Sequence, residues 1–328
     1  MAKKFKSKGI AMDASEKFVT GVAYVLMTVF SLIAILPCLH VISKSVSGGI
    51  YVAAGNIWFW PRGFQLETME YILFKTPFFS ALKNSLIVTG VGTLVSVLVS
   101  ITTAYPLSKP NFKGRKVITL LYVFSMVFFG GMVPAYLVVQ MLGLLDTYAG
   151  MILPFAIVQF NMFIVKNYFE GLPETVEESA RIDGAGDFTI LTKIVIPMST
   201  PVIATVTLLY AINYWNNYFH AMMYTQSIDM KTLQVYLFDL INSGSSFLDQ
   251  MASGGYYGDG IGASIDVNVT ADGITAAAVT LSLVPIVALY PFVQRFLIKG
   301  ITIGSVKGLF IFYCTMQSNK KSKKEIAK

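Results

Sequence analysis

The chain has 328 residues, of which 55% are hydrophobic and only 13% are charged, and its mean hydropathy is +0.63. Soluble domains carry about 25% charged residues, so this composition excludes an ordinary soluble protein and predicts a polytopic membrane protein. The net charge is +7, but the basic residues are spread around apolar segments, a pattern that does not favour nucleic acid as a partner. The two cysteines, Cys38 and Cys314, lie far apart and predict neither a disulfide framework nor a metal site.

Six apolar runs without charges predict membrane-spanning helices, each of which needs about 20 such residues. In chain order they are Phe18–Ile42, Asn84–Ser108, Val117–Leu145, Thr147–Val165, Thr200–Met222 (within the longer run Ile194–Ile228) and Ile274–Gln294. The first run follows a basic start, but it is too long for a signal peptide and no clear cleavage site follows it. We therefore expect an all-α protein with six spans over residues 18–308, a basic N-terminal segment at 1–17 and a basic tail at 309–328.

The distribution of lysine and arginine predicts the orientation. With the N-terminus inside, 20 of the 25 basic residues fall on the inner side of the six spans, as the positive-inside rule requires. Both termini and the 170–197 segment are then cytoplasmic, and the 223–273 segment is external. The tail suits contact with anionic membrane lipid.

The 170–197 segment predicts two short helices joined by a turn. Pro173 suits a first helical turn, and the acidic residues after it favour the N-terminal end of a helix. Asp183-Gly184 ends that helix, because glycine readily adopts the left-handed conformation, and a second helix begins near Asp187. Phe188, Leu191 and Val195 follow at helical spacing, which predicts one apolar face.

The same segment resembles the EAA loop of ABC-importer membrane subunits. The resemblance runs through Glu178-Ser-Ala-Arg-Ile-Asp183-Gly184-Ala185 and Ile194-Val-Ile-Pro197, with Ser179 and Ile196 as conservative departures. In that family the loop contacts a separate ATPase subunit, and the membrane domain has the type I importer fold. The resemblance therefore implies that the ATPase-coupling residues here are Glu178, Ala180, Asp183, Gly184, Ile194 and Pro197.

Other segments resemble carbohydrate-uptake permeases of the maltose-permease type. They are the closing segment 290–308, the Trp215-Asn216 element, and the oligosaccharide- and polysaccharide-type segments Gly130–Pro134 and Gly143–Thr147. The resemblance implies a bacterial cytoplasmic-membrane permease subunit that works by alternating access. The implied partners are a second permease, which makes a heterodimer, two ATPases that bind ATP and magnesium, and an extracellular solute-binding protein. The chain itself is expected to bind no cofactor.

A sugar path needs amide, hydroxyl and aromatic groups within the spans. The candidates are Asn84, Gln159, Asn161, Tyr210, Asn213, Trp215, Asn216 and Asn217. The alternative is that these side chains hold helices together by hydrogen bonds inside the bilayer, and the sequence leaves that alternative open.

The external 223–273 segment is rich in glycine and serine, which predicts a mobile loop. In sugar importers of the type resembled here, this loop can reach into the bound solute receptor. Phe247, Tyr256 and Tyr257 are therefore the candidate contacts with the binding protein. Asp266-x-Asn268-x-Thr270-x-Asp272 has the spacing of a calcium loop, but it lacks the turn glycine and the closing glutamate, so no metal is expected.

The sequence contains no Gly-Lys-Ser or Gly-Lys-Thr, and so no phosphate-binding loop of that type. Its two histidines, His40 and His220, lie near span ends and suit structural roles. We therefore expect a transporter subunit and not an enzyme. The spans hold essentially no ionisable residues, which argues against an ion-driven carrier. An ABC permease for a solute other than sugar remains the main alternative.

Overall fold

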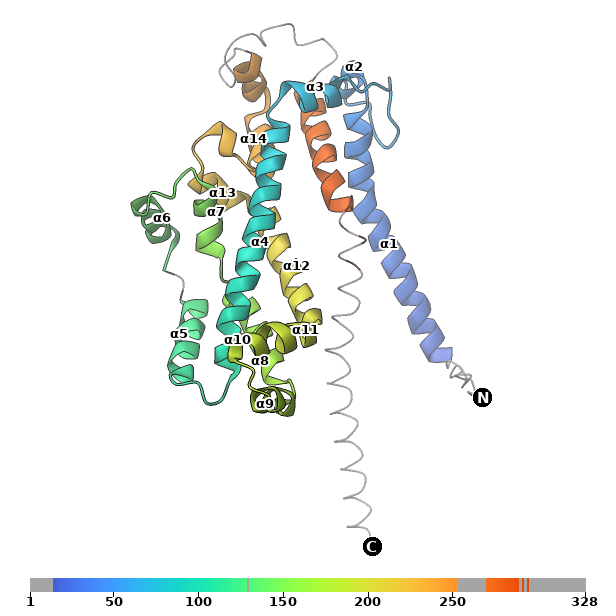
Figure 1. Cartoon of the computed structure of the whole chain (residues 1–328). Helices are drawn as coiled ribbons and strands as arrows, with labels where there is room; N and C mark the ends of the chain where they lie inside the picture. The colour runs from blue at the N-terminus through green and yellow to red at the C-terminus, as the bar shows by residue number, and fades with distance from the viewer. Residues whose placement is uncertain (1–13, 129, 253–269, 289–290, 292–293, 295–328) are drawn as a thin grey trace. The chain divides into compact units, whose positions relative to one another are not determined.

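The computed structural model describes the chain except for residues 1–13, 129, 253–269, 289–290, 292–293 and 295–328 (Figure 1). Within the described residues every regular element is a helix, as expected from the sequence. The helices of the first part are α1 (Ala14–Ser45), α2 (Gly49–Ala53), α3 (Glu67–Lys75), α4 (Phe78–Ser108), α5 (Arg115–Val127), α6 (Met132–Met141), α7 (Tyr148–Ile152), η1 (Leu153–Phe155) and α8 (Gln159–Glu170).

The remaining elements follow in chain order. They are α9 (Glu174–Ile182), α10 (Asp187–Ile190), the π-helical turn η2 (Leu191–Val195), α11 (Ile196–Met198), α12 (Thr200–Asn216), α13 (Tyr218–Tyr224), η3 (Ile228–Met230), α14 (Leu233–Ala252) and a helix at Ala271–Ala288.

The chain divides into two units, of which the first holds residues 1–75 and 260–281. In this unit the long helix α1 exposes most of its apolar side chains, as a helix in contact with lipid or another subunit does. The end of α1 is tied to the following loop, because Ser43 Oγ donates to the Phe59 carbonyl at 2.6 Å. Lys44 also pairs with Asp272 at 2.8 Å, so the start of the Ala271–Ala288 helix is held at the same end of α1.

The second unit holds residues 76–259 and 282–328, and its core forms where α4, α8 and α12 meet. Figure 1 shows α4 and α12 side by side, with α8 at one end of the pair. Three of the large side chains in this core are fully buried: Leu107 of α4, Met162 of α8 and Tyr210 of α12. The same core continues under the short helices, since Ile190 and Val195 are also fully buried. The 174–197 segment is therefore packed onto the helical bundle.

Two of the predicted spans contain a bend, and a third, Thr200–Met222, follows a bend and divides into α12 and α13 at Asn217. Three helices are long and apolar enough to cross a membrane alone: Lys17–Ser45, Phe78–Ser108 and Ala271–Ala288. The other three candidates are pairs: Arg115–Val127 with Met132–Met141, bent by 115°, Tyr148–Phe155 with Gln159–Glu170, bent by 52°, and Asp187–Met198 with Thr200–Asn216, bent by 84°. The count of six holds if each pair crosses once, so it stays a prediction.

Glycine and proline account for these breaks. The predicted span Val117–Leu145 is not one continuous helix, because Gly131 adopts φ +95° at the N-cap of α6 and the chain turns there. Pro154 lies in the break between α7 and α8, and Pro197 and Pro201 flank the bend before α12. Proline lacks the N–H that an unbroken helix needs.

The prediction of a mobile loop across 223–273 is also wrong for a large part of that segment. Residues 233–252 form α14, including Gly244 and its neighbouring serines. The helix is held because Leu233, Tyr236, Leu237 and Leu240 are buried at helical spacing. These buried residues lie before the Gly-Ser stretch. The Gly- and Ser-rich composition of that stretch predicted a loop, whereas the helical spacing of the residues before it predicts a helix. Phe247 lies within α14, whereas Tyr256 and Tyr257 lie outside the described residues.

Candidate functional site

The 174–197 segment forms the helix–turn–helix that the sequence predicts. Helix α9 begins after Pro173, which occupies the N-cap and not the first helical position, and carries Glu174 and Glu177 in its first turn. Gly184 ends the helix with φ +83°, a left-handed conformation that costs other residues about 1–2 kcal/mol. The Ala185 N–H then donates to the Ala180 carbonyl at 2.9 Å and closes the turn.

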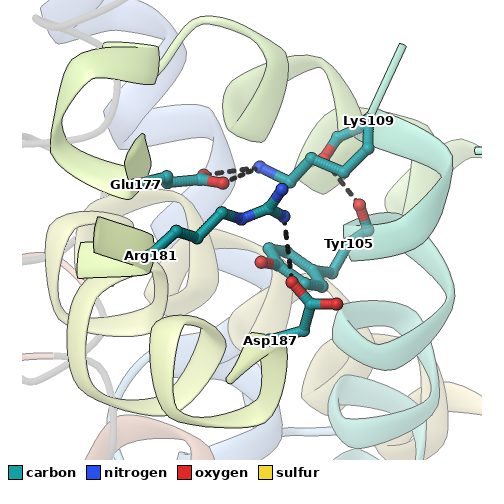
Figure 2. Close-up of polar contacts among 6 residues, drawn as sticks. Tyr105, Lys109, Glu177, Arg181 and Asp187 are labelled. Carbon is teal, nitrogen blue, oxygen red and sulfur yellow. Dashed lines mark hydrogen bonds and ion pairs between the residues drawn. The ribbon is translucent and has the colours of Figure 1, made fainter. Parts of the chain in front are cut away.

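Two ion pairs fix the segment (Figure 2). Arg181 of α9 pairs with Asp187 of α10 at 2.9 Å. This pair is exposed, and exposed pairs contribute only about 0–1 kcal/mol. The second pair is more enclosed: Lys109, directly after α4, binds both carboxylate oxygens of Glu177, and the two side chains are 24% and 12% exposed.

The predicted coupling residues fall into two groups. Glu178, Asp183, Gly184 and Pro197 are exposed and available to a partner. Ala180 and Ile194 are half-buried, and Ala180 packs against the core. The predicted coupling residues therefore lie together in one small helix–turn–helix. Only the four exposed ones contribute to its surface.

Two exposed apolar residues at the tip of this segment were not predicted from the sequence. Ile182 is 86% exposed and Phe188 is 78% exposed, on either side of the Asp183–Gly186 turn. The prediction that Phe188 shares a buried face with Leu191 and Val195 is wrong. That prediction assumed a regular 3.6-residue helix, whereas residues 191–195 form a π-helical turn and the buried face runs through Ile190. The apolar type of Ile182, at the end of a mainly polar helix, was the available signal.

The candidate path residues lie in different environments. Asn84 is buried, and its amide group is fully engaged: it donates to the carbonyls of Asp229 and Lys231 at 2.6 and 3.0 Å and accepts from Tyr148 at 2.7 Å. Asn217 accepts from the His220 N–H as the N-cap of α13. These contacts favour structural roles for both residues.

The other candidates are less engaged or differently placed. Asn213 and Asn216 are exposed on α12, and Gln159 donates to Ser125 at a long 3.3 Å. Asn161 is buried on α8. Trp215 is 9% exposed, and its indole N–H has no hydrogen-bond partner within the described residues. Among the predicted path residues, Asn213 and Asn216 are thus the exposed polar side chains, and Gln159 makes only a long hydrogen bond.

Tyr210, also a path candidate, belongs to a set of hydroxyl contacts between α4 and α12. Tyr210 pairs with Ser100 at 2.7 Å and Tyr214 pairs with Ser96 at 2.9 Å. Each tyrosine also reaches the broken span: Tyr210 accepts from the Val158 N–H at 3.0 Å, and Tyr214 donates to the Ile152 carbonyl at 3.1 Å. The hydroxyls therefore satisfy backbone groups that the break between α7 and α8 frees from helical bonding.

Ligands for a metal ion are not gathered in the described part of the chain. No group of three or more histidine, cysteine, aspartate or glutamate residues has the arrangement to hold one there. Asp272 of the calcium-like stretch is instead the partner of Lys44.

This architecture, with its apolar helices and exposed helix–turn–helix, is that of a multi-pass membrane transport subunit. Residues 92–303 match the family described as binding-protein-dependent transport system inner membrane component, and the chain belongs to that family. The resemblance to ABC-importer membrane subunits is thereby confirmed. Members of this family are permease subunits of ABC transporters, in which ATP is hydrolysed on a separate chain.

Two relatives from Bacillus subtilis (strain 168) cover most of the chain. Protein LplC is 40% identical over 84% of this chain and 90% of its own length. The polygalacturonan/rhamnogalacturonan transport system permease protein YtcP is 38% identical over 87% of this chain and 96% of its own length. The chain is thus similar to a permease that is named for polysaccharide transport.

A solved structure matches as well. A chain of a bacterial ABC transporter involved in the import of the acidic polysaccharide alginate has a TM-score of 0.77 and is 32% identical, and the match covers 87% of this chain and 99% of that chain. The type I importer fold that the sequence resemblance implied is therefore shared along most of the chain.

Proposed function

We propose that this chain is the permease subunit of an ATP-driven importer for an oligosaccharide or polysaccharide and forms half of the translocation pathway. The single observation that carries the proposal is the family match over residues 92–303, which includes the whole 174–197 segment. The carbohydrate class is supported by the relatives named above for pectic polysaccharides and alginate. ATP and magnesium belong to the partner ATPase.

The 174–197 segment is the proposed docking site for that ATPase. Its outer surface combines the carboxylates of Glu178 and Asp183 with the exposed apolar side chains of Ile182 and Phe188. Apolar side chains set among charged ones suit a protein interface, because anchors of this kind carry much of the binding energy. The distribution of basic residues supports a cytoplasmic position for the segment, on the side of the ATPase, and for both termini.

The remaining proposed partners are the other subunits of such an importer. A second permease subunit completes the pathway as a heterodimer, two ATPase subunits dock on the cytoplasmic side, and an extracellular binding protein delivers the solute to the bacterial membrane. Phe247 of α14, with Tyr256 and Tyr257, is the proposed contact with that binding protein. Asn213 and Asn216 of α12 and Gln159 of α8 are the proposed solute contacts. Asn161 and Trp215 stay weaker candidates.

Reconstitution tests this function. The permease pair, the ATPase and the binding protein are placed in proteoliposomes, and uptake of oligogalacturonides, alginate oligosaccharides and a neutral oligosaccharide is measured with ATP inside. We expect ATP-dependent uptake of at least one of them, and a loss of ATPase association when Glu178 and Asp183 are both replaced by lysine. Uptake without the ATPase would indicate a secondary carrier, and uptake of none of the sugars would contradict the carbohydrate class.

A labelling experiment tests the orientation on which docking depends. A cysteine introduced at Thr189 should react with an impermeant maleimide only after lysis, and one introduced at Ser253 should react from outside, in a background lacking Cys38 and Cys314. The reverse pattern would place the 174–197 segment outside and would overturn the docking assignment.

A further inference from the structure

The two neighbouring glutamates of α9 have opposite environments. Glu178 is exposed, whereas Glu177 is buried and its carboxylate is bound by Lys109 from the end of α4. These partners are 68 residues apart in the chain. The resemblance to the EAA loop gives no role to Glu177 or to Lys109, so this contact is a separate feature of the structure.

Lys109 is held in place from a second direction. Its ammonium lies 4.8 Å from the centre of the Tyr105 ring, one helical turn back on α4. The Tyr105 ring in turn packs edge-to-face against Phe169 of α8, with 6.4 Å between ring centres. A cation over an aromatic face is attracted to it. Lys109 is therefore oriented toward Glu177 by its surroundings and is not a free surface lysine (Figure 2).

The contact joins two parts that each have polar contacts of their own. On one side, the Arg181–Asp187 ion pair and the closed turn at Gly184 hold α9 and α10 together. On the other side, the Ser96–Tyr214 and Ser100–Tyr210 hydrogen bonds hold α4 to α12. Lys109, directly after α4, and Glu177 of α9 form an ion pair, and Arg181 of α9 also interacts with Tyr105 of α4. The ion pair therefore adds a directional, charged connection between α9 and α4 to the apolar packing of the segment on the core.

We propose that Lys109 and Glu177 form a latch that passes movement of the 174–197 segment to α4, and that both are positioning residues for transport. The proposal rests on ATPase docking at this segment. Two adjacent residues of α9 then have different functions. Glu178 contacts the ATPase, and Glu177 transmits the resulting motion to α4. Loss of the latch leaves the ATPase bound but lets α9 move without α4.

The test uses the complete reconstituted complex. Glu177→Gln and Lys109→Met each remove one charge, and the number of sugar molecules transported per ATP hydrolysed is measured together with co-purification of the ATPase. We expect this ratio to fall about tenfold, within the range of typical coupling factors, while the ATPase still co-purifies. Matched controls are Lys113→Met, which removes an exposed charge nearby, and Arg115→Met, which breaks an ion pair to Glu170 that does not involve α9. Both should retain the wild-type ratio.

Two double variants separate a latch from a general loss of stability. The exchange Lys109→Glu with Glu177→Lys should restore at least half of the wild-type ratio, because it recreates the pair in reverse. Lys109→Met with Glu177→Gln should be no worse than either single change, because the second change removes the charge that the first leaves unpaired. Wild-type coupling in the single variants, or independent effects in the neutral double variant, would overturn the latch.

The outcomes also separate this proposal from the docking proposal. If Glu178→Lys with Asp183→Lys leaves ATPase association intact, docking at this surface is wrong. If that pair of changes abolishes association while the Glu177 and Lys109 variants couple normally, only the latch is wrong.

Discussion

Helix α4 and the residue that follows it make two kinds of polar contact with neighbouring helices. Along its length, neutral hydroxyls of Ser96 and Ser100 bind tyrosines of α12, and all of these side chains are buried. Just beyond its end, the charged Lys109 binds Glu177 of α9 in a partly exposed site. Ions are costly inside a bilayer, whereas hydroxyls are tolerated there once they are paired. The interior contact therefore suits permanent packing, and the charged contact suits a joint between parts that water can reach.

The largest expected effect comes from filling space in the interior contact. A Cβ added at Gly92 would lie 2.8 Å from the Tyr214 ring, which is itself hydrogen-bonded. Gly92→Val should therefore destabilise the protein by about 3 kcal/mol, at the upper end of the usual cost of overpacking. The thermal unfolding midpoint of the purified complex measures this. Gly90→Val is the control, because nothing lies within 4 Å of a Cβ there. Equal midpoints for the two variants would show that α4 and α12 are not tightly packed.

A smaller loss is expected from removing one hydroxyl. Tyr210→Phe leaves Ser100 and the Val158 N–H without this partner, which should cost about 1–2 kcal/mol in a membrane. The double variant Tyr210→Phe with Ser100→Ala should lose less than the sum of the two single losses, since the two side chains share one bond. Strictly additive losses in thermal unfolding would contradict the pairing. Raising the salt concentration should leave these losses unchanged, because the contact carries no charge.

The smallest effect belongs to the turn of the 174–197 segment. Gly184→Ala forces an alanine into the left-handed conformation at φ +83°, at a cost of about 1 kcal/mol, or about fivefold in a binding constant. We expect weaker association with the ATPase in a titration of the reconstituted permease, with little change in thermal stability. Gly186→Ala is the matched control, because Gly186 has φ −73° and open space around it. If both changes weakened association with the ATPase equally, the left-handed turn at Gly184 would have no special role in docking.

The sequence predicted those features that depend on local chemistry. Pro173, the acidic first turn and Gly184 mark the start and end of α9, and the structure places them there because capping and backbone freedom act over a few residues. The protein family could also be predicted, since the motif combines particular residue types with a fixed spacing. The long apolar runs predicted α1 and α4 well, because burial in lipid demands an uninterrupted stretch.

Features that depend on tertiary contacts could not be predicted. The Lys109–Glu177 pair joins residues far apart in the chain, and nothing local distinguishes Glu177 from Glu178. The three hydrogen bonds of Asn84 likewise join it to η3, Lys231 and α7, which are distant in the chain. The structural role of its amide therefore could not be predicted from the sequence. The π-helical turn at Leu191–Val195 shifted the apolar face, and α14 was missed because composition was weighted above the periodicity of its buried residues.

The bend at Ser199 has a mechanical consequence. The stretch Asp187–Met198 meets α12 at 84°, so it projects almost perpendicular to the axis of that helix. At a rise of 1.5 Å per residue, such an arm is about 18 Å long. A sideways displacement of about 3 Å at its tip corresponds to a turn of roughly 10° about the α12 axis over that length. A short sideways push at the tip would thus rotate α12, which carries Asn213 and Asn216, so that the direction in which those amides face would change without any sliding along the helix axis.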